Sequence, residues 1–336
     1  MLMKKIYLYP KVYPTENPYI SNLEKALNSH FIVVNRKNNT KGVLDLFRYF
    51  FKADIFYFNW IENIPSRKFG KAQVVIFVVF LFLIKALGKK VIWTLHNKYS
   101  HEKADCRWTD FMYSLMFRRS DFILTHSGEG IDFAEKKYPK DAEKVKYYIH
   151  PVTRLYPVRT AKDPVYDFLI WGTIWPYKGI VEFLKFLKDA GEKPSICLAG
   201  ICVNEEMKNT LGPWLSDNIV HIDRFLGFDE IADLANKSRF TLFTYATGSV
   251  LSSGSLMDSI AMGSVVIGPD AGAFRDLSSY GFVKTYKRYE DIIEILKTYG
   301  QAYSDGNKNI ESFWEENNWD KFGNRLTEDI MTSLFK

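Results

Sequence analysis

Cysteine is scarce in this chain of 336 residues, which contains only Cys106, Cys197 and Cys202. Three scattered thiols are too few for a disulfide framework or a zinc cluster, so we interpret them as free thiols in a reducing compartment. The opening residues, MLMKKIYLYP, lack the long apolar core and small-residue cleavage site of a signal peptide. We therefore expect no export.

The most apolar stretch is too short to span a bilayer. Residues 74–84 are eleven consecutive apolar residues, whereas a spanning helix needs about twenty. Lysines flank the stretch, at Lys68 and Lys71 before it and at Lys85, Lys89 and Lys90 after it. Two interpretations stay open: a helix buried between a sheet and its neighbours, or a helix lying at a lipid interface with lysines on the headgroups.

Acidic residues are under-represented in the first half of the chain. Up to residue 155 there are 26 Lys and Arg against 14 Asp and Glu, and after it 19 against 25. A basic half indicates a polyanionic partner, either a membrane surface or a nucleic acid. Because no nucleic-acid-binding motif accompanies it, we expect a peripheral membrane surface and no nucleic acid.

Short apolar runs alternate with helical patterns along the chain, which is long enough for two domains. This alternation predicts an α/β protein with two doubly wound, Rossmann-like domains of parallel strands, and ligands at the carboxyl ends of those strands. A proline-containing linker at 150–164 separates the two series. The predicted strands are 5–9, 31–34, 55–60, 90–95, 122–126 and 146–149, then 166–171, 195–199, 219–222, 240–244, 265–267 and 282–284.

The stretch FLIWGTIWPYKG at 168–179 opens the second series. It reads as a strand, a tight turn and the start of a helix. Such a junction offers free backbone N–H groups and the positive end of a helix dipole, both of which suit a phosphate. Lys178 adds a formal positive charge there. The alternative is an ordinary turn with a surface lysine.

This stretch, together with MDSIAMGSVVIGPDAGAFRDL at 257–277, ICLAG at 196–200 and THSGEGIDF at 125–133, resembles the GT-B glycosyltransferases, and among them family 4. The resemblance covers nearly the whole chain. It implies an N-terminal acceptor domain at 1–155, a C-terminal nucleotide-sugar donor domain at 156–308, and a cleft between them. The aromatic helical segment 309–336 would return to brace the first domain.

The sequence departs from the family pattern at two positions. Val250 stands where the family has the first of two glutamates, the second being matched by Asp258, and Thr173 stands where an arginine often follows the first glycine. By resemblance, Asp258 would accept hydrogen bonds from ribose hydroxyls. The sequence contains no Asp-x-Asp pair, so we expect no metal and stabilisation of the diphosphate by protein donors instead. The candidate donor-binding residues are Gly172, Thr173, Lys178, Arg224, Ser253, Gly254, Ser255 and Asp258.

Candidate acceptor residues follow the strands of the first half. His96, which matches the family's position near the transferred sugar, is expected to orient a hydroxyl or accept a proton, and with Lys178 it forms the candidate catalytic pair. His101 and Glu102 are a competing acid–base pair on the same loop. The other candidate acceptor contacts are Tyr13, Asn17, Trp60, Glu62 and Asn97.

The sequence thus predicts a metal-independent glycosyltransferase with no separate cofactor, using a UDP- or GDP-sugar and a glycan or lipid-linked acceptor. By resemblance, it would act in bacterial surface polysaccharide biosynthesis at the cytoplasmic face of the cell membrane, with retention at the anomeric carbon. Two alternatives stay open. One is a catalytically silent sugar- or partner-binding protein, suggested by Val250 and Thr173. The other is a sugar-nucleotide epimerase of the same fold, which would act without an acceptor.

Overall fold

The computed structural model describes residues 3–11, 18–36, 42–98, 106–154, 156, 164–245, 251–298 and 303–335. The chain divides into two compact units. The first comprises Met1–Pro151, Ser249–Ser252 and Trp319–Lys336, and the second comprises Val152–Gly248 and Ser253–Asn318. Each unit has its own sheet and its own hydrophobic core.

The first unit is built on a parallel sheet, which has six strands in the described part of the chain, in the order β2-β1-β3-β4-β5-β6. The strands are β1 (Lys5–Tyr9), β2 (Ile32–Val33), β3 (Ile55–Asn59), β4 (Lys90–Leu95), β5 (Phe122–Thr125) and β6 (Val145–Tyr147). The helices and 3-10 turns are α1 (Tyr19–Asn28), η1 (Gly42–Leu44), α2 (Asp45–Tyr49), η2 (Ile61–Ser66), α3 (Gly70–Ala86), α4 (Cys106–Arg119), α5 (Gly128–Lys137) and η3 (Ala142–Lys144).

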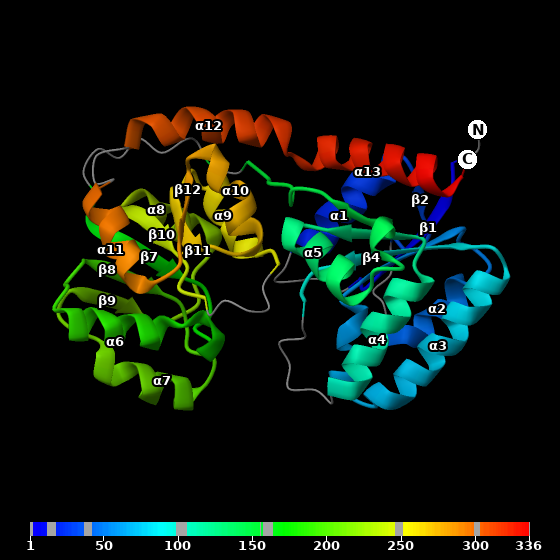
Figure 1. The fold of residues 1–336 in the computed structure, drawn as a ribbon, viewed down its shortest axis with the longest axis horizontal. Helices are drawn as coiled ribbons and strands as arrows, with labels where there is room; N and C mark the ends of the chain where they lie inside the picture. Colours follow the sequence, from blue (N-terminus) through cyan, green and yellow to red (C-terminus); the bar gives the residue numbers. More distant parts are fainter. Residues whose placement is uncertain are drawn as a thin grey trace. The chain divides into compact units, whose positions relative to one another are not determined.

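Both faces of this sheet are covered, because successive side chains of a strand point to opposite faces. On β3, Phe56 and Phe58 pack with α2, α3, α4 and α5, whereas Ile55 and Tyr57 pack with α1 and the C-terminal helix α13. Figure 1 shows α2, α3 and α4 on one side of the sheet and α1 with α13 on the other. This explains why the central strands are almost continuously apolar.

The second unit repeats the plan, with the strand order β12-β11-β10-β7-β8-β9 among its described residues. Its strands are β7 (Tyr166–Trp171), β8 (Ile196–Ala199), β9 (Ile219–Ile222), β10 (Ser238–Leu242), β11 (Val266–Pro269) and β12 (Val283–Tyr286). Its helices and turns are η4 (Pro176–Lys178), α6 (Ile180–Ala190), α7 (Glu205–Leu211), η5 (Gly212–Trp214), α8 (Phe228–Asn236), α9 (Gly254–Ala261), α10 (Gly272–Leu277), η6 (Ser278–Tyr280), α11 (Tyr289–Thr298) and α12 (Tyr303–Glu316).

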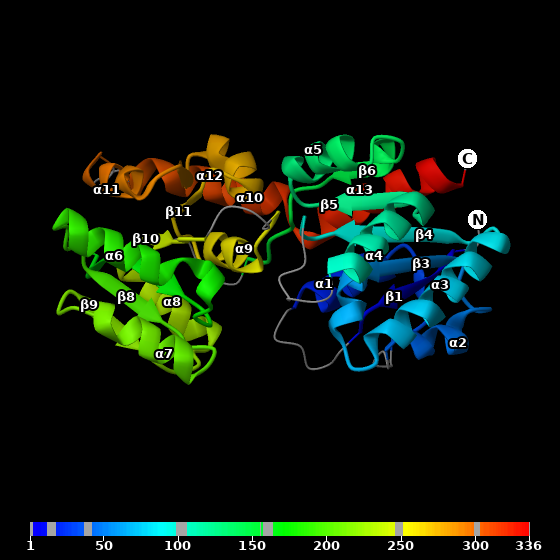
Figure 2. The same ribbon diagram turned by 60° about the horizontal axis from the view of Figure 1, so that its bottom comes forward.

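The two faces of the second sheet are also both covered. Phe168 and Ile170 of β7 pack with α6, α7 and α11, and Leu169 packs with α8 and the end of α9. Figure 2 views the two sheets from a second direction. The prediction of an α/β protein with two doubly wound parallel sheets is confirmed.

Each sheet has a switch point, where the chain reverses the direction in which it adds strands. In the first sheet it lies between β1 and β3, and in the second between β7 and β10. The loops that leave two such strands at their carboxyl ends diverge, which leaves a crevice where ligands bind in open α/β sheets. The topology therefore places ligand-binding segments after β1 and β3, and after β7 and β10.

The segment 309–336, expected as one returning helix, contains the end of α12 and the whole of a second helix. In α12 of the second unit, the Phe313 ring lies 5.0 Å from that of Tyr280, and Trp314 Nε1 donates to the Ile260 carbonyl oxygen at 3.0 Å. The second helix, α13 (Trp319–Leu334), belongs to the first unit and buries Phe322 and Leu326 against α1. In the described part of the chain, no helix is both long enough and apolar enough to cross a membrane.

Candidate active site

The turn after β7 is closely packed and depends on two glycines with positive φ. Gly172 (φ +85°) leaves the strand, and Gly179 (φ +66°) joins η4 to α6. A Cβ on Gly179 would lie 2.3 Å from the Thr244 carbonyl oxygen, and one on Gly172 would lie 3.2 Å from Lys178 Nζ. Glycine is therefore required where this turn meets the end of β10 and where the lysine amine approaches the backbone.

Lys178 is the most unusual side chain of the turn. It is 7% exposed, and its Nζ donates to the Trp171 carbonyl oxygen at 3.0 Å. Among the described residues it makes no ion pair, so two of its three ammonium donors have no described acceptor. Burial lowers the pKa of Lys178 to about 8. A buried cation with unused donors is suited to bind an anion.

The loop after β10 lies against this turn. Thr244 Oγ1 donates to the Lys178 carbonyl oxygen at 2.6 Å, and Tyr286 OH donates to the Phe243 carbonyl oxygen at 3.1 Å. The Tyr245 ring lies 6.0 Å from that of Tyr177. The segments after β7 and β10 therefore meet at the switch point of the second sheet, as the topology requires.

The start of α9 provides backbone donors at the same sheet edge. Ser253 is the N-cap, and its Oγ accepts from Leu256 N at 3.4 Å and lies 3.4 Å from Tyr245 OH. Gly254 and Ser255 occupy the first turn, where amide N–H groups have no acceptor within the helix. Ser253 thus has a capping role, while the N–H groups of Gly254 and Ser255 point out of the helix end, where they suit an anion.

Asp258 lies one turn further along α9. Its carboxylate forms no hydrogen bond or ion pair with the described residues, and desolvation raises its pKa to about 7. The next residue, Ser259, accepts a hydrogen bond from Trp171 Nε1 at 2.9 Å. Trp171 therefore connects α9 to Lys178, because its side chain bonds Ser259 and its carbonyl oxygen accepts from Lys178 Nζ. Sequence analysis did not assign this role to Trp171.

One of the expected donor contacts, Arg224, stands apart from the turn. Arg224 follows β9, which is separated from β7 by β8, a distance of about 10 Å across the sheet. It is exposed, and its guanidinium pairs with the Glu230 carboxylate at 2.5 Å and 3.2 Å. The structure therefore does not bring Arg224 to the turn. Thr173 lies within the turn and is partly buried.

In the first unit, Trp60 and His96 lie together at the carboxyl ends of β3 and β4. Their rings stack at 4.3 Å with an interplanar angle of 15°. Asn59 Nδ2 donates to the Tyr9 carbonyl oxygen, which leaves Asn59 Oδ1 facing His96 Nε2 at 3.1 Å. Nε2 therefore carries the proton and Nδ1 is the acceptor. Burial lowers the pKa of His96 to about 3, so its imidazole is neutral at pH 7.

Two further histidines lie near His96, and sequence analysis missed both. His126 follows β5 and His150 follows β6, and their rings lie 4.8 Å apart. Tyr19, at the start of α1, has its ring 5.1 Å from His96, and its hydroxyl lies 2.8 Å from His126 Nε2. Because His126 Nδ1 donates to the Tyr148 carbonyl oxygen at 2.9 Å, Tyr19 is the donor in the second bond. We call His96, His126 and His150 the histidine cluster.

Glu62 does not lie with Trp60 and His96. It is 1% exposed in η2, and its Oε2 accepts from Trp93 Nε1 at 3.3 Å within the core shared with α4. Burial raises its pKa to about 7. Asn97 directly follows His96, and its carbonyl oxygen accepts from Tyr113 OH at 2.9 Å.

Four sequence predictions cannot be placed. Tyr13, Asn17, His101 and Glu102 lie outside the described residues, as does Val250.

One group of side chains could hold a metal in the described part of the chain. Cys202, His221 and Asp223 offer ligand atoms within 4.8 Å of one another. However, Lys208 Nζ already pairs with Asp223 Oδ2 at 2.6 Å, and burial raises the pKa of the Cys202 thiol. A metal would have to displace the lysine and deprotonate the thiol, so this donor set does not favour one. Cys197 and Cys202 are free thiols.

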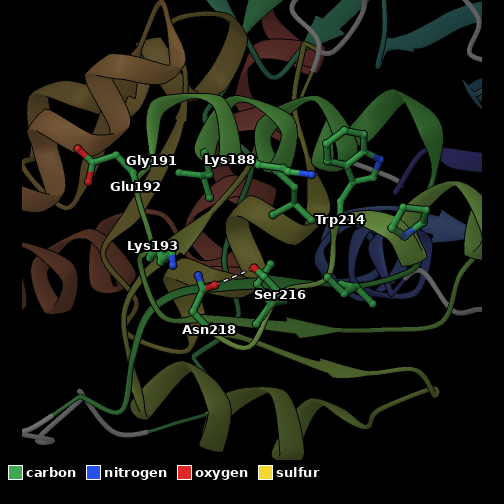
Figure 3. Close-up of a pocket in the computed structure, with 12 residues that line it drawn as sticks. Lys188, Gly191, Glu192, Lys193, Trp214, Ser216 and Asn218 are labelled. Atoms are coloured by element: carbon green, nitrogen blue, oxygen red, sulfur yellow. Dashed lines mark hydrogen bonds between the residues drawn. The ribbon is translucent and has the colours of Figure 1, made fainter.

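A pocket of about 210 Å³ lies in the second unit between the end of α6 and the start of β9 (Figure 3). Gly191 closes α6 on one side, and Ser216 and Asn218 precede β9 on the other, joined by a 2.7 Å hydrogen bond. The Lys188 ammonium lies 5.2 Å from the centre of the Trp214 ring. The pocket is at the amino-terminal edge of the sheet, opposite the edge that carries Lys178 and Asp258.

Comparisons with known proteins gave matches only among solved structures: no family model matches the chain, and no curated protein matches its sequence. HepE of Anabaena, solved with UDP and glucose, is similar with a TM-score of 0.70 and 13% identity, over 98% of this chain and 100% of HepE. AviGT4, a glycosyltransferase of avilamycin A biosynthesis, is similar with a TM-score of 0.58 and 13% identity, over 98% of each chain.

The chain has the GT-B fold. A putative UDP-N-acetylglucosamine 2-epimerase of Listeria monocytogenes is also similar, with a TM-score of 0.55 and 12% identity, over 98% of this chain and 96% of the epimerase. The GT-B fold therefore accommodates both transferases and an epimerase among these neighbours. Which activity this chain has depends on its own residues.

Proposed function

We propose that this chain is a glycosyltransferase that takes a sugar from a nucleoside diphosphate donor and transfers it to a glycan or a lipid-linked acceptor. The observation that carries the proposal is the buried ammonium of Lys178 at the switch point of the second sheet, which forms no ion pair with any described residue. The GT-B fold and a neighbour solved with UDP and glucose support it. The UDP bound to this neighbour also favours UDP over GDP as the donor nucleotide.

In this proposal the donor diphosphate lies on the turn after β7. When the bond between the sugar and the β-phosphate breaks, negative charge develops on the phosphate oxygen, and fixed donors in a partly dry site stabilise it. Lys178 supplies a cation, and the N–H groups of Gly254 and Ser255 supply dipoles. Asp258 accepts hydrogen bonds from the ribose. These protein donors make the transfer independent of a metal.

The acceptor side of the proposal rests on Trp60 and His96. The acceptor atom of the His96 imidazole, Nδ1, has no hydrogen-bond partner among the described residues and can receive a hydrogen bond from a sugar hydroxyl. Because burial lowers the pKa of His96 to about 3, the imidazole is a weak base, and orienting a hydroxyl suits it better than removing a proton. The Trp60 ring offers an apolar face for a sugar ring. Asn97 adjoins His96 on the same loop.

Binding of UDP, measured by isothermal titration calorimetry without metal, tests the donor site. We expect the wild type to bind UDP and Lys178→Met to bind it roughly 10- to 150-fold more weakly, the range for losing a hydrogen bond to a charged group. Lys185→Met is the matched control, because Lys185 is exposed on α6 and its ammonium lies over the ring of Trp214, which lines the pocket of Figure 3. Equal binding by both variants would overturn the site.

Two other functions are tested by the products. An epimerase, the activity named for the Listeria neighbour, would convert a UDP-sugar without an acceptor, which proton NMR of the donor detects. A catalytically silent binding protein would bind UDP but consume no donor with any acceptor offered. The transferase proposal expects UDP release that requires an acceptor. Retention at the anomeric carbon and a role in bacterial surface polysaccharide assembly belong to the same proposal, on the resemblance to family 4.

A further inference from the structure

Exposed apolar side chains are concentrated on one layer of the first unit. Half of the large apolar side chains that are exposed in the described part of the chain come from η1, α2, α3, α4 and the residues that adjoin them. We call this set the apolar face: Leu44, Phe47, Phe51, Phe69, Val75, Val79, Phe82, Leu83, Leu87 and Phe111. A patch of this kind on a folded protein marks a binding surface.

Helix α3 is apolar on both sides. Val74, Phe77, Leu81 and Ile84 are buried against the sheet. The outward stripe is formed by residues 75, 79, 82 and 83, which follow the spacing of one helix face and are 46–55% exposed. A helix that only covered a sheet would place polar residues on that outer stripe. Packing within the unit therefore explains one side of α3 and leaves the other unexplained.

The neighbouring elements continue the apolar face around α3. The Phe47 ring of α2 packs edge-on against Phe80 of α3 at 4.3 Å, and Phe51, just after α2, is 84% exposed. On the side of α4, the Arg119 guanidinium lies 4.3 Å from the centre of the Phe82 ring. Both views show α2, α3 and α4 side by side on this layer (Figures 1 and 2). The apolar side chains therefore form one surface.

Basic residues surround this surface. Residues 42–90 contain eight Lys and Arg but only three Asp and Glu. The protein engages all three acids: Asp45 Oδ2 accepts from Tyr7 OH at 3.3 Å, Asp54 accepts from Lys5 N at 2.9 Å, and Glu62 is buried. Arg48, Lys52, Lys68 and Lys71 are exposed at the rim. An apolar centre with a basic rim matches the boundary between acyl chains and anionic headgroups.

We propose that the apolar face docks on an anionic lipid bilayer, with α3 lying in the plane of the interface and the rim lysines on the headgroups. A second copy of the chain fits less well, because a twofold contact would bring the same basic rims together. An acidic protein would match the rim alone. Lipid matches both the rim and the apolar centre.

The apolar face also reaches the candidate acceptor site within the first unit. Phe69 and Lys68 lie between η2 and α3, and η2 begins directly after Trp60, so the start of α3 and Trp60 share one edge of the sheet. If the proposed transferase function holds, a lipid-linked acceptor anchored in the bilayer would meet Trp60 first. This step rests on the proposed function, whereas docking does not.

Co-sedimentation with vesicles tests the docking. The full-length chain is incubated with vesicles of phosphatidylcholine containing 30% phosphatidylglycerol, and with vesicles of phosphatidylcholine alone. The test variant is the double substitution Val75→Glu with Val79→Glu, at positions 55% and 54% exposed. The matched control is Val165→Glu with Val220→Glu, which makes the same change at positions 62% and 45% exposed in the second unit. Exposed positions leave the cores intact.

We expect the wild type and the control to bind the anionic vesicles, and the test variant to bind at least about tenfold more weakly, because two valines lose burial and two carboxylates meet an anionic surface. Binding by the wild type should weaken without phosphatidylglycerol. Equal loss in the control variant, or no vesicle binding by the wild type, would overturn the proposal. The proposal would also be overturned if sedimentation velocity showed that the wild type and the control are dimers and that only the test variant is a monomer. UDP binding by the test variant keeps the two proposals separable, since the donor site lies in the second unit.

Discussion

The charge of Lys178 should make donor binding depend on pH in a range where few other groups titrate. Burial lowers the pKa of Lys178 to about 8, so the ammonium form dominates below pH 8 and the neutral amine above it. A diphosphate binds the ammonium form. The contribution of Lys178 to the affinity for UDP should therefore be constant below pH 8 and fall as the pH rises above it. Asp258, whose pKa burial raises to about 7, adds the same pH dependence to every Lys178 variant.

The size of the effect follows from the fraction of charged lysine. With a pKa of about 8, roughly nine tenths of the molecules carry the charge at pH 7 and one tenth at pH 9. The apparent Kd for UDP should then rise about tenfold between these two pH values, or about 1.4 kcal/mol.

Calorimetric titrations of UDP at pH 7, 8 and 9 measure this dependence. Lys178→Arg retains the charge at every pH and should remove the dependence. Lys178→Met should also remove this dependence on pH, with weaker binding at every pH. This second variant serves if an arginine does not fit the buried position. Lys185→Met should behave as the wild type, and any titration of UDP itself affects all four proteins equally. A tenfold loss that persists in Lys178→Met would refute the assignment.

Three further predictions concern the turn, the ribose contact and the histidine cluster. Gly179→Ala should lower the free energy of unfolding in urea by at least about 2 kcal/mol more than Gly191→Ala, because both have positive φ but only the first would press a Cβ against the Thr244 carbonyl oxygen. Asp258→Ala should weaken UDP about tenfold and leave pyrophosphate binding unchanged in calorimetry; an equal loss for both ligands would contradict the ribose contact. Burial holds the pKa of His126 well below its usual value, so the unfolded chain binds the extra proton below about pH 6.5, and stability should fall as the pH drops. Urea titrations should show the wild type losing up to about 1.4 kcal/mol per pH unit more than His126→Gln between pH 6.5 and 5, and parallel curves would contradict this.

Most of the architecture could be predicted from the sequence because parallel strands buried on both faces give short, continuous apolar runs. All twelve strands described by the structure overlap the predicted ones, with differences of one or two residues at the ends. The break in the C-terminal helical segment was less predictable. The segment 309–336 has an uninterrupted helical pattern, yet Asn317 and Asn318 separate α12 from α13, and Asn318 forms an isolated bridge with Val152. Such a break depends on tertiary contacts that a local pattern does not contain.

The positions of the candidate donor residues were easier to predict than those of the candidate acceptor residues, for a physical reason. Lys178 and Asp258 follow β7 and β10, and the backbone alone brings the carboxyl ends of two adjacent parallel strands together. Their positions therefore depend on strand order, which the alternation of elements implies. Arg224 was predicted as a donor contact but does not reach the turn, because it follows β9, two strands away from β7, and pairs with Glu230. Its position agrees with the dependence on strand order.

On the acceptor side, the direction in which each side chain points decides whether it reaches the candidate site. The sequence pattern does not show this direction. Glu62 follows β3 as Trp60 does, but it turns into the core toward Trp93. His126 and His150 were not selected, although each follows a predicted strand, because their meeting depends on the Tyr19 ring that packs against all three imidazoles of the histidine cluster. The cluster lies around the first residue of α1, at the same sheet edge as Trp60. The acceptor site should therefore be sought around Tyr19 and the histidine cluster, and not around Glu62.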